Sequence, residues 1–216
     1  MPPPHKAQSN GRVLGVPTDL NDLAAVENLF TRTLAEFGRL DILVNNATNV
    51  SQGGFFAMDE TGWDHVFDSK LRGTVRCIRH AVPPMRERKW GRIINISGGA
   101  AWTPQLGAIT TGLNNAAVQN LTVALANELA RDGILVNAIV PTAVRTERHD
   151  RNIRDAMAKT GQSEAEVLKP RVAKIPLGRM AASEEIAAVV VFLASERASF
   201  VTGSLWPVDG GVSARL

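Results

Sequence analysis

The chain has 216 residues and a net charge of +3 at pH 7. A hydrophobic fraction of 44% and a charged fraction of 21% are ordinary for a globular domain, and they exclude a disordered chain or a highly basic nucleic-acid-binding protein. The sequence has one cysteine, no apolar run of membrane-spanning length and no apolar core of a signal peptide. We therefore expect a cytoplasmic protein without a nucleic-acid or membrane partner.

The amino-terminal part predicts two strands separated by a helix. Residues 1–11 are polar and proline-rich, and we expect them to be disordered. Residues 12–17 and 40–46 have the composition of short strands. Asn21 or Asp22 is expected to cap the helix between them. The apolar face of this helix, which ends before Gly38, comprises Leu23, Val26, Leu29, Phe30, Leu34 and Phe37.

The central part predicts a helix, a strand, a second helix and a second strand. Apolar side chains recur at helical spacing from Trp63 to Val82, and the two prolines that follow are expected to stop this helix. Residues 91–97 form a β-branched run that ends at Gly98 and Gly99, and residues 134–140 form another apolar run. The helix between the two runs has an apolar stripe of Leu113, Ala117, Leu121, Ala124 and Leu125.

The carboxy-terminal part completes an alternation of strands and helices. Residues 145–174 are polar and basic and predict one or two helices. Ser183 is expected to cap a further helix, and residues 204–208 to form the last strand. Strands joined by crossover helices lie parallel. We therefore predict one α/β domain over residues 12–216, with a doubly wound parallel sheet between two layers of helices.

Several short motifs occur in the order and at the distances typical of one enzyme family. Residues 45–48 (NNAT) follow a predicted strand, residues 91–97 (GRIINIS) form the next strand, and residues 134–141 (ILVNAIVP) form the one after. Residues 201–203 (VTG) and 208–211 (VDGG) complete the pattern. The ordered set resembles the short-chain dehydrogenase/reductase family over about residues 12–212, and this resemblance implies a Rossmann-like fold.

The resemblance also implies a glycine-rich turn that holds the cofactor pyrophosphate at a helix N-terminus. No two of the 18 glycines are separated by a single residue, so the sequence contains no Gly-x-Gly-x-x-Gly motif. We interpret the chain as a divergent, amino-terminally truncated member that lacks the first βαβ portion of the fold. Residues 12–17 should then either pair with residues 40–46 or remain unpaired, and the truncated fold should expose apolar surface unless a partner covers it.

The family implies NAD or NADP as the cofactor. Residual contacts are expected from Asp19 and Leu20 beside the adenine, from Asn46 and Ala47 after the second predicted strand, and from Thr146 beside the nicotinamide. Without the glycine-rich turn, we expect cofactor binding to be impaired.

The family's catalytic residues are a Tyr that passes the proton, a Lys four residues later, a Ser thirteen residues before the Tyr and an Asn on the preceding helix. Matching these motifs places Thr111 at the Tyr position, Asn115 at the Lys position, Gly98 at the Ser position and Lys70 at the Asn position. All four residues are replaced, and the chain contains no tyrosine. A threonine hydroxyl is far less acidic than a phenol, so we expect hydride transfer to be impaired or lost.

Lys70 and Ser97 are the candidate substitutes in this site. Lys70 follows Val66 by four residues and Phe67 by three, so it lies on or beside the inward stripe of its helix, and its ammonium could reach the site and serve as a base or form a Schiff base. The favoured alternatives are an ammonium that extends into solvent from the edge of an apolar face, and a Ser97 hydroxyl bonded to backbone. The histidines have no metal-ligand spacing with Cys77 or the acids, so we expect no metal site.

Three functions are compatible with these residues. The first is a pseudoenzyme that acts as a ligand-binding or partner subunit, and the second is a lyase, isomerase or atypical reductase that uses Lys70. The third is a fragment of a longer NAD(P)-dependent dehydrogenase. Residues 63–82 and 113–129 resemble helices that pair across a dimer interface in the family, so we expect a homodimer or homotetramer. The basic segment 145–174 favours an acidic or polar small-molecule ligand.

Overall fold

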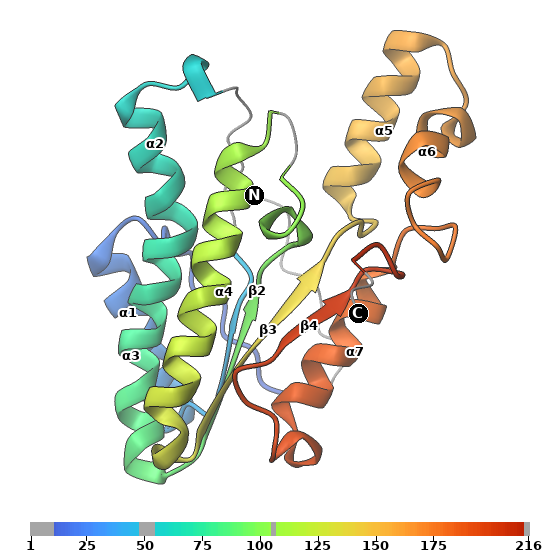
Figure 1. Ribbon diagram of the computed structural model, residues 1–216. Helices are drawn as coiled ribbons and strands as arrows, with labels where there is room; N and C mark the ends of the chain where they lie inside the picture. Colours follow the sequence, from blue (N-terminus) through green and yellow to red (C-terminus); the bar gives the residue numbers. More distant parts are fainter. Residues whose placement is uncertain (1–10, 48–54, 105–106, 214–216) are drawn as a thin grey trace.

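The computed structural model of the protein describes residues 11–47, 55–104 and 107–213. Its centre is a parallel sheet with the spatial order β1-β2-β3-β4, and helices lie on both of its faces (Figure 1). The strands are β1 (Ile42–Asn45), β2 (Gly91–Ile96), β3 (Ile134–Pro141) and β4 (Leu205–Val208). The predicted α/β class is confirmed. Residues 1–10, which were predicted to be disordered, lie outside the described residues.

The helices follow the predicted alternation with the strands. In chain order they are α1 (Leu23–Phe37), α2 (Glu60–Phe67), the π-helical turn η2 (Asp68–Arg72), α3 (Gly73–Arg88), α4 (Ile109–Leu129), α5 (Glu147–Thr160), α6 (Glu164–Val172) and α7 (Ser183–Ala194). Short 3₁₀ turns, among them η3 (Gly99–Ala101) and η4 (Ala130–Asp132), connect some of these elements.

The sheet separates two apolar cores because successive side chains of a strand point to opposite faces. Ile93 packs with side chains of α1, α3 and α4, whereas Ile94 packs with Leu193 of α7. Both isoleucines are almost completely buried. Strands covered on both faces are continuously apolar rather than alternating, which explains the runs that marked β2 and β3 in the sequence.

Local capping signals were predicted correctly for α1. The Asp22 carboxylate accepts hydrogen bonds from the backbone N–H groups of Ala24 and Ala25, and Gly38 ends the helix with φ of 72°. Val26 and Phe30 of the predicted apolar face are buried, and other side chains of that face, Leu23 and Phe37, are exposed.

Three predictions about local structure were wrong. Residues 12–17 form no strand, because they make no ladder hydrogen bonds with β1 or another strand. The two prolines do not stop the central helix. Pro83 and Pro84 lie inside α3, which continues to Arg88, and the Met85 side chain directly after them is fully buried in the core. Ser183 is the first residue of α7 rather than its cap, and the Glu185 carboxylate instead accepts a hydrogen bond from the N–H of Ala182.

One face of β1 is uncovered within the described residues. Ile42 and Val44 are 43% and 41% exposed. Val44 pairs with Ile94, whose side chain packs with α7, so Ile42 and Val44 lie on the α7 side of the sheet. The helix α7 itself contacts β2 and β3. Apolar surface is therefore exposed beside β1 in the described part of the chain.

Gly133, between η4 and β3, offers a test of the tight turn that leads into the sheet. Its φ is +72°, and a Cβ at this position would overlap the carbonyl oxygen of Lys89. We expect Gly133→Ala to lower the free energy of unfolding by more than about 3 kcal/mol, measured by urea denaturation.

The matched control is Gly38→Ala. Gly38 has the same φ, but a Cβ there would meet no atom within 4 Å. We expect this variant to cost only about 1 kcal/mol, and equal losses for the two variants would contradict the packing of this turn.

Candidate functional site

The candidate site lies where β2 ends and α4 begins. Its loop is closely packed: a Cβ on Gly99 would lie 2.5 Å from Cγ2 of Thr142, and a Cβ on Gly112 would lie 3.0 Å from the carbonyl oxygen of Ala100. Glycines at these positions let the loop fit between α4 and the segment after β3. In open parallel sheets, ligands bind beyond the carboxyl ends of the strands, which is the position of this loop.

The predicted apolar stripe of α4 is confirmed only in part: Leu121 and Leu125 pack against the core, but near the site the face that points to the sheet is largely polar. Leu113 is 44% exposed, whereas Asn115 and Gln119 are only 3% and 5% exposed. The Gln119 Nε2 donates a hydrogen bond to the Ser97 Oγ at 2.9 Å, and this hydroxyl donates to the backbone oxygen of Asn115 at 3.2 Å. Ser97 is therefore bonded to backbone, as in the alternative considered for it, and its hydroxyl is already engaged.

A second set of buried polar side chains crosses the sheet next to the site. The Asn45 Nδ2 donates to the Asn95 Oδ1 at 2.8 Å, and the Asn95 Nδ2 donates to the Thr122 Oγ1 at 2.9 Å. Asn95 and Thr122 are fully buried. Because an unpaired buried amide is costly, this chain of hydrogen bonds fixes β1, β2 and α4 relative to one another.

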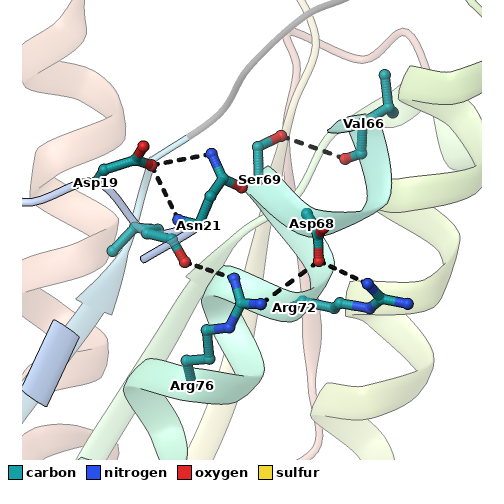
Figure 2. A network of polar contacts seen from close by, with 8 residues as sticks. Asp19, Asn21, Val66, Asp68, Ser69, Arg72 and Arg76 are labelled. Carbon is teal, nitrogen blue, oxygen red and sulfur yellow. Dashed lines mark hydrogen bonds and ion pairs between the residues drawn. The ribbon is translucent and has the colours of Figure 1, made fainter. Parts of the chain in front are cut away.

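The π-helical turn η2 carries Lys70 and is tied to the loop before α1 (Figure 2). The Asp68 carboxylate accepts hydrogen bonds from Arg72 at 2.8 Å and from Arg76 at 3.5 Å. Arg76 also donates to the carbonyl oxygen of Leu20 at 2.7 Å. Figure 2 shows these groups converging on one side of the turn. A π turn shifts the following side chains relative to a regular helix, and such turns are frequent at functional sites.

Lys70 and Asn115 meet directly. The Lys70 Nζ donates a hydrogen bond to the Asn115 Oδ1 at 2.6 Å, although the two residues come from different helices. Burial lowers the pKa of Lys70 from 10.5 to about 8. The alternative in which this ammonium extends into solvent is therefore wrong. At neutral pH the group is still mainly an ammonium, and it can donate a hydrogen bond to an oxygen of a bound ligand.

Gly98 makes room for this contact. A Cβ on Gly98 would lie only 2.7 Å from the Asn115 Nδ2, so a larger residue there would displace the amide. Three of the four positions matched to catalytic residues, Lys70, Asn115 and Gly98, thus lie in one continuous set of contacts. The fourth, Thr111, is half-buried on the first turn of α4 and takes no part in this set within the described residues.

The residues predicted to touch a cofactor adenine have structural partners. The Asp19 carboxylate accepts hydrogen bonds from the backbone N–H and the side-chain amide of Asn21, both at 2.9 Å (Figure 2). Leu20 packs against Gly73: a Cβ added to Gly73 would lie 3.0 Å from the Cβ of Leu20. The first N–H groups of α1 bond to Asp22, so this helix N-terminus holds a carboxylate of the chain itself.

The other predicted cofactor contacts lie at the ends of elements. Asn46 and Ala47 are exposed just after β1, and Thr48 of the same motif lies outside the described residues. The Thr146 hydroxyl caps α5 by accepting the N–H of His149.

The basic segment 145–174 forms the two predicted helices, α5 and α6, which lie beyond the carboxyl end of β3 (Figure 1). Arg145 forms ion pairs with Asp150 and Glu164, both at 2.9 Å. The His149 Nε2 lies 2.8 Å from the Arg171 Nη1. The pKa of His149 is lowered, mainly by burial and secondarily by the positive charge of Arg171. Among the described residues no group of acids, histidines and cysteine is arranged to hold a metal ion.

Sequence reasoning missed Gln119, Asn95 and Thr122. These residues form no sequence motif, because each of them acts through a hydrogen bond between α4 and β2 or the residue after it, which the spacing along the chain does not reveal. The available signal was the set of polar residues that interrupts the apolar stripe of α4.

The chain is similar to many known proteins over nearly its whole length. The profile of the enoyl-(acyl carrier protein) reductase family matches residues 4–213. The (2S)-[(R)-hydroxy(phenyl)methyl]succinyl-CoA dehydrogenase subunit BbsD of Thauera aromatica is 36% identical over 207 residues, which are 94% of this chain and 77% of the relative. The 3-oxoacyl-[acyl-carrier-protein] reductase FabG of Staphylococcus aureus is 34% identical over 199 residues, 91% of this chain and 76% of the relative.

Solved structures agree with this similarity. YwfH, an NADPH-dependent reductase of bacilysin biosynthesis, superposes with a TM-score of 0.85 at 29% identity, over 92% of this chain and 76% of that one. ElxO with bound NADP superposes with a TM-score of 0.81 at 28% identity, over 91% and 77%. Within the described residues no helix is long and apolar enough to cross a membrane.

The burial of Lys70 predicts a pH dependence of stability. Its pKa of about 8 lies below the ordinary 10.5, so the unfolded chain binds this proton more tightly than the folded protein. The resulting cost is fully present below pH 8 and disappears as the pH rises to 10.5. We expect the stability of the wild type relative to Lys70→Met to rise by on the order of 3 kcal/mol between pH 7.5 and pH 10.5.

Urea denaturation across this pH range measures the difference. Lys159→Met, which removes an exposed lysine of α5, corrects for the general effect of losing one positive charge. A wild-type minus Lys70→Met difference that stays constant with pH would contradict the burial of this ammonium.

Proposed function

Because the chain belongs to the enoyl-(acyl carrier protein) reductase family of short-chain dehydrogenases/reductases, we propose that it binds a small-molecule ligand at the carboxyl ends of β2 and β3. We further propose that it does so as a divergent member without the tyrosine-dependent hydride transfer of the family, as a ligand-binding or partner subunit.

The observation that carries this proposal is the contact between Lys70 and Asn115. By the motif matching, Lys70 stands at the family's Asn position and Asn115 at its Lys position, so the amide and the ammonium have changed places between the two helices. The two side chains form a hydrogen bond of 2.6 Å. Gly98 supports the arrangement because it leaves space for the Asn115 amide. The place of the proton-transferring phenol is taken by Thr111, and the sequence has no tyrosine that could replace it. The charged group is therefore suited to holding a ligand rather than to tuning a phenol.

The proposal extends to the cofactor. The structural relatives include YwfH, an NADPH-dependent reductase, and ElxO with bound NADP, so a nicotinamide cofactor is expected for the family. In this chain Leu20 packs on Gly73, and the sequence lacks a Gly-x-Gly-x-x-Gly turn. These features support binding of a nicotinamide cofactor that is too weak to saturate.

A second candidate is an enzyme of altered mechanism, such as a lyase, isomerase or atypical reductase. It is favoured by the lowered pKa of Lys70, because an amine with a pKa of about 8 is partly unprotonated near neutral pH and can accept a proton or attack a carbonyl carbon. Ser97 is a less suited partner because its hydroxyl already bonds to the Asn115 backbone and to Gln119.

A third candidate is a segment of a longer NAD(P)-dependent dehydrogenase. The chain covers 77% of the Thauera relative and 76% of the Staphylococcus relative, so this candidate is compatible with the similarity. The name of the Thauera relative identifies it as a dehydrogenase subunit, which is compatible with a partner-subunit role as well. Reading the codons upstream of Met1 for a strand, a glycine-rich turn and a helix separates this candidate from the other two.

A reductase assay tests the main proposal. With 3-oxoacyl thioesters or simple ketones, we expect NADH or NADPH to be oxidised at least about 10³-fold more slowly than by the Staphylococcus aureus relative, because the acid–base group is replaced. Calorimetry with NADPH should show no saturable binding. Turnover at the rate of the relative would overturn the proposal. If slow turnover appears and Lys70→Met abolishes it, the altered-mechanism candidate is supported, and unchanged turnover in that variant rejects it.

We also propose that the chain forms a homodimer or homotetramer through outward faces of its helices. Leu113 and Val123 of α4 are 44% and 40% exposed, which supports an apolar contact with a second copy. The exposed Ile42 and Val44 of β1 offer a further apolar patch for a partner.

Light scattering after gel filtration tests this assembly. We expect a mass of two or four 23.2-kDa chains for the wild type, and a smaller species for the double variant Leu113→Arg/Val123→Arg, because buried arginines lack partners. Asn152→Arg on α5 is the control for added charge. A monomeric wild type, or an unchanged mass in the double variant, would contradict the proposal.

A further inference from the structure

Lys70 is a partly buried cation without a carboxylate partner in the described part of the chain. The ion pairs found there use arginines and Lys89, and none uses Lys70. The nearest acid in the sequence, Asp68, is held by Arg72 and Arg76 (Figure 2). The partner of the ammonium is the neutral amide oxygen of Asn115 at 2.6 Å.

One neutral acceptor compensates a buried ammonium only in part. Removing a cation from water is costly unless it is paired, and an ammonium has three hydrogens to donate, of which the Asn115 contact uses one. Burial is also the cause of the lowered pKa of Lys70, and no neighbouring acid offsets it. The folded chain therefore gains free energy if an anion from solution binds to Lys70.

Among the described residues, no acid contributes to the pKa shift of Lys70. The side chains that pack next to it or to its partner are neutral: Asn115 itself, the Ser97 hydroxyl and the Gln119 amide, which are linked by hydrogen bonds. Across the same edge of the sheet, the segment 145–174 carries eight arginines and lysines against five acids. An anionic ligand thus approaches a site with a favourable potential.

We propose that Lys70, positioned by Asn115, is the binding group for the carboxylate of a small organic acid. This inference rests on the proposed ligand-binding function and deepens it by naming the chemical class of the ligand. The charge balance supports a carboxylate over a phosphate, because a single ammonium matches a single negative charge, whereas phosphate sites usually combine several cationic or backbone donors. In this arrangement two Nζ hydrogens remain for the carboxylate oxygens while the third stays on Asn115.

The experiment is an NMR titration of the ¹⁵N-labelled protein with three probes: butyrate, its neutral analogue butyramide, and inorganic phosphate. We expect butyrate to shift the backbone signals around Lys70 and Asn115, and to bind at least about tenfold more tightly than butyramide at pH 7, because only butyrate carries a charge. The butyrate affinity should fall roughly 30-fold between pH 7 and pH 9.5, as the ammonium loses its proton.

Matched variants separate this site from general attraction to a basic protein. Lys70→Met and Lys70→Gln should each weaken butyrate binding at least about tenfold, and Lys89→Met, which removes an exposed lysine outside the segment 145–174, should leave it unchanged. If Lys70→Met fails to fold, the Lys70→Gln variant and the wild-type pH profile still decide the question.

Several results would overturn the inference: no shift with butyrate, equal affinity for butyrate and butyramide, tighter binding of phosphate, or binding that is insensitive to Lys70 and to pH. The outcome is independent of the reductase assay. Nicotinamide-dependent turnover would refute the proposed function without removing a carboxylate site, and failure of butyrate binding would leave the absence of turnover untouched.

Discussion

The structure depends on the burial of β2 and β3 between two layers of helices. Ile93 and Ile94 of β2 point to opposite cores, so the strand is fixed on both faces and its parallel neighbours are fixed with it. Because the strands are parallel, their carboxyl ends meet at one edge, where the loop of Gly98 and Gly99 enters α4. The buried hydrogen bonds from Asn95 to Asn45 and Thr122 then set the distance between the sheet and α4. The geometry of the candidate site follows from these contacts.

Within this frame several neighbouring residues of the candidate site fit together. A larger residue at position 98 would collide with the Asn115 amide, and without this amide the Lys70 ammonium would be buried without an acceptor. The π turn that carries Lys70 is in turn fixed by Asp68, Arg72 and Arg76. These residues form a consistent arrangement, which is why we interpret them as a ligand site rather than as the remains of a damaged one. Consistency of this kind across neighbouring positions is what a sequence that specifies one structure requires.

Sequence patterns predicted those features that depend on local chemistry or on long apolar runs. The cap at Asp22, the end of α1 at Gly38 and the buried strands β2 and β3 belong to this group. The run at residues 12–17 was misjudged because a short apolar segment becomes a strand only if a neighbour pairs with it. The inward face of α4 was misjudged for a related reason: its amides are buried because partners from β2 satisfy them, and spacing along one helix does not reveal such partners.

Lys70 lies between these two cases. Its spacing from Val66 and Phe67 allowed an inward direction but favoured an ammonium in solvent, because its partner Asn115 comes from another helix and is brought to it by the topology. The most direct test of the central claim is a pH titration of the Lys70 side chain by NMR, with the signal of selectively labelled lysine assigned through Lys70→Gln. The structure predicts a midpoint near pH 8, where burial places the pKa, and a midpoint near 10.5 would show that the ammonium is in solvent and would contradict the account.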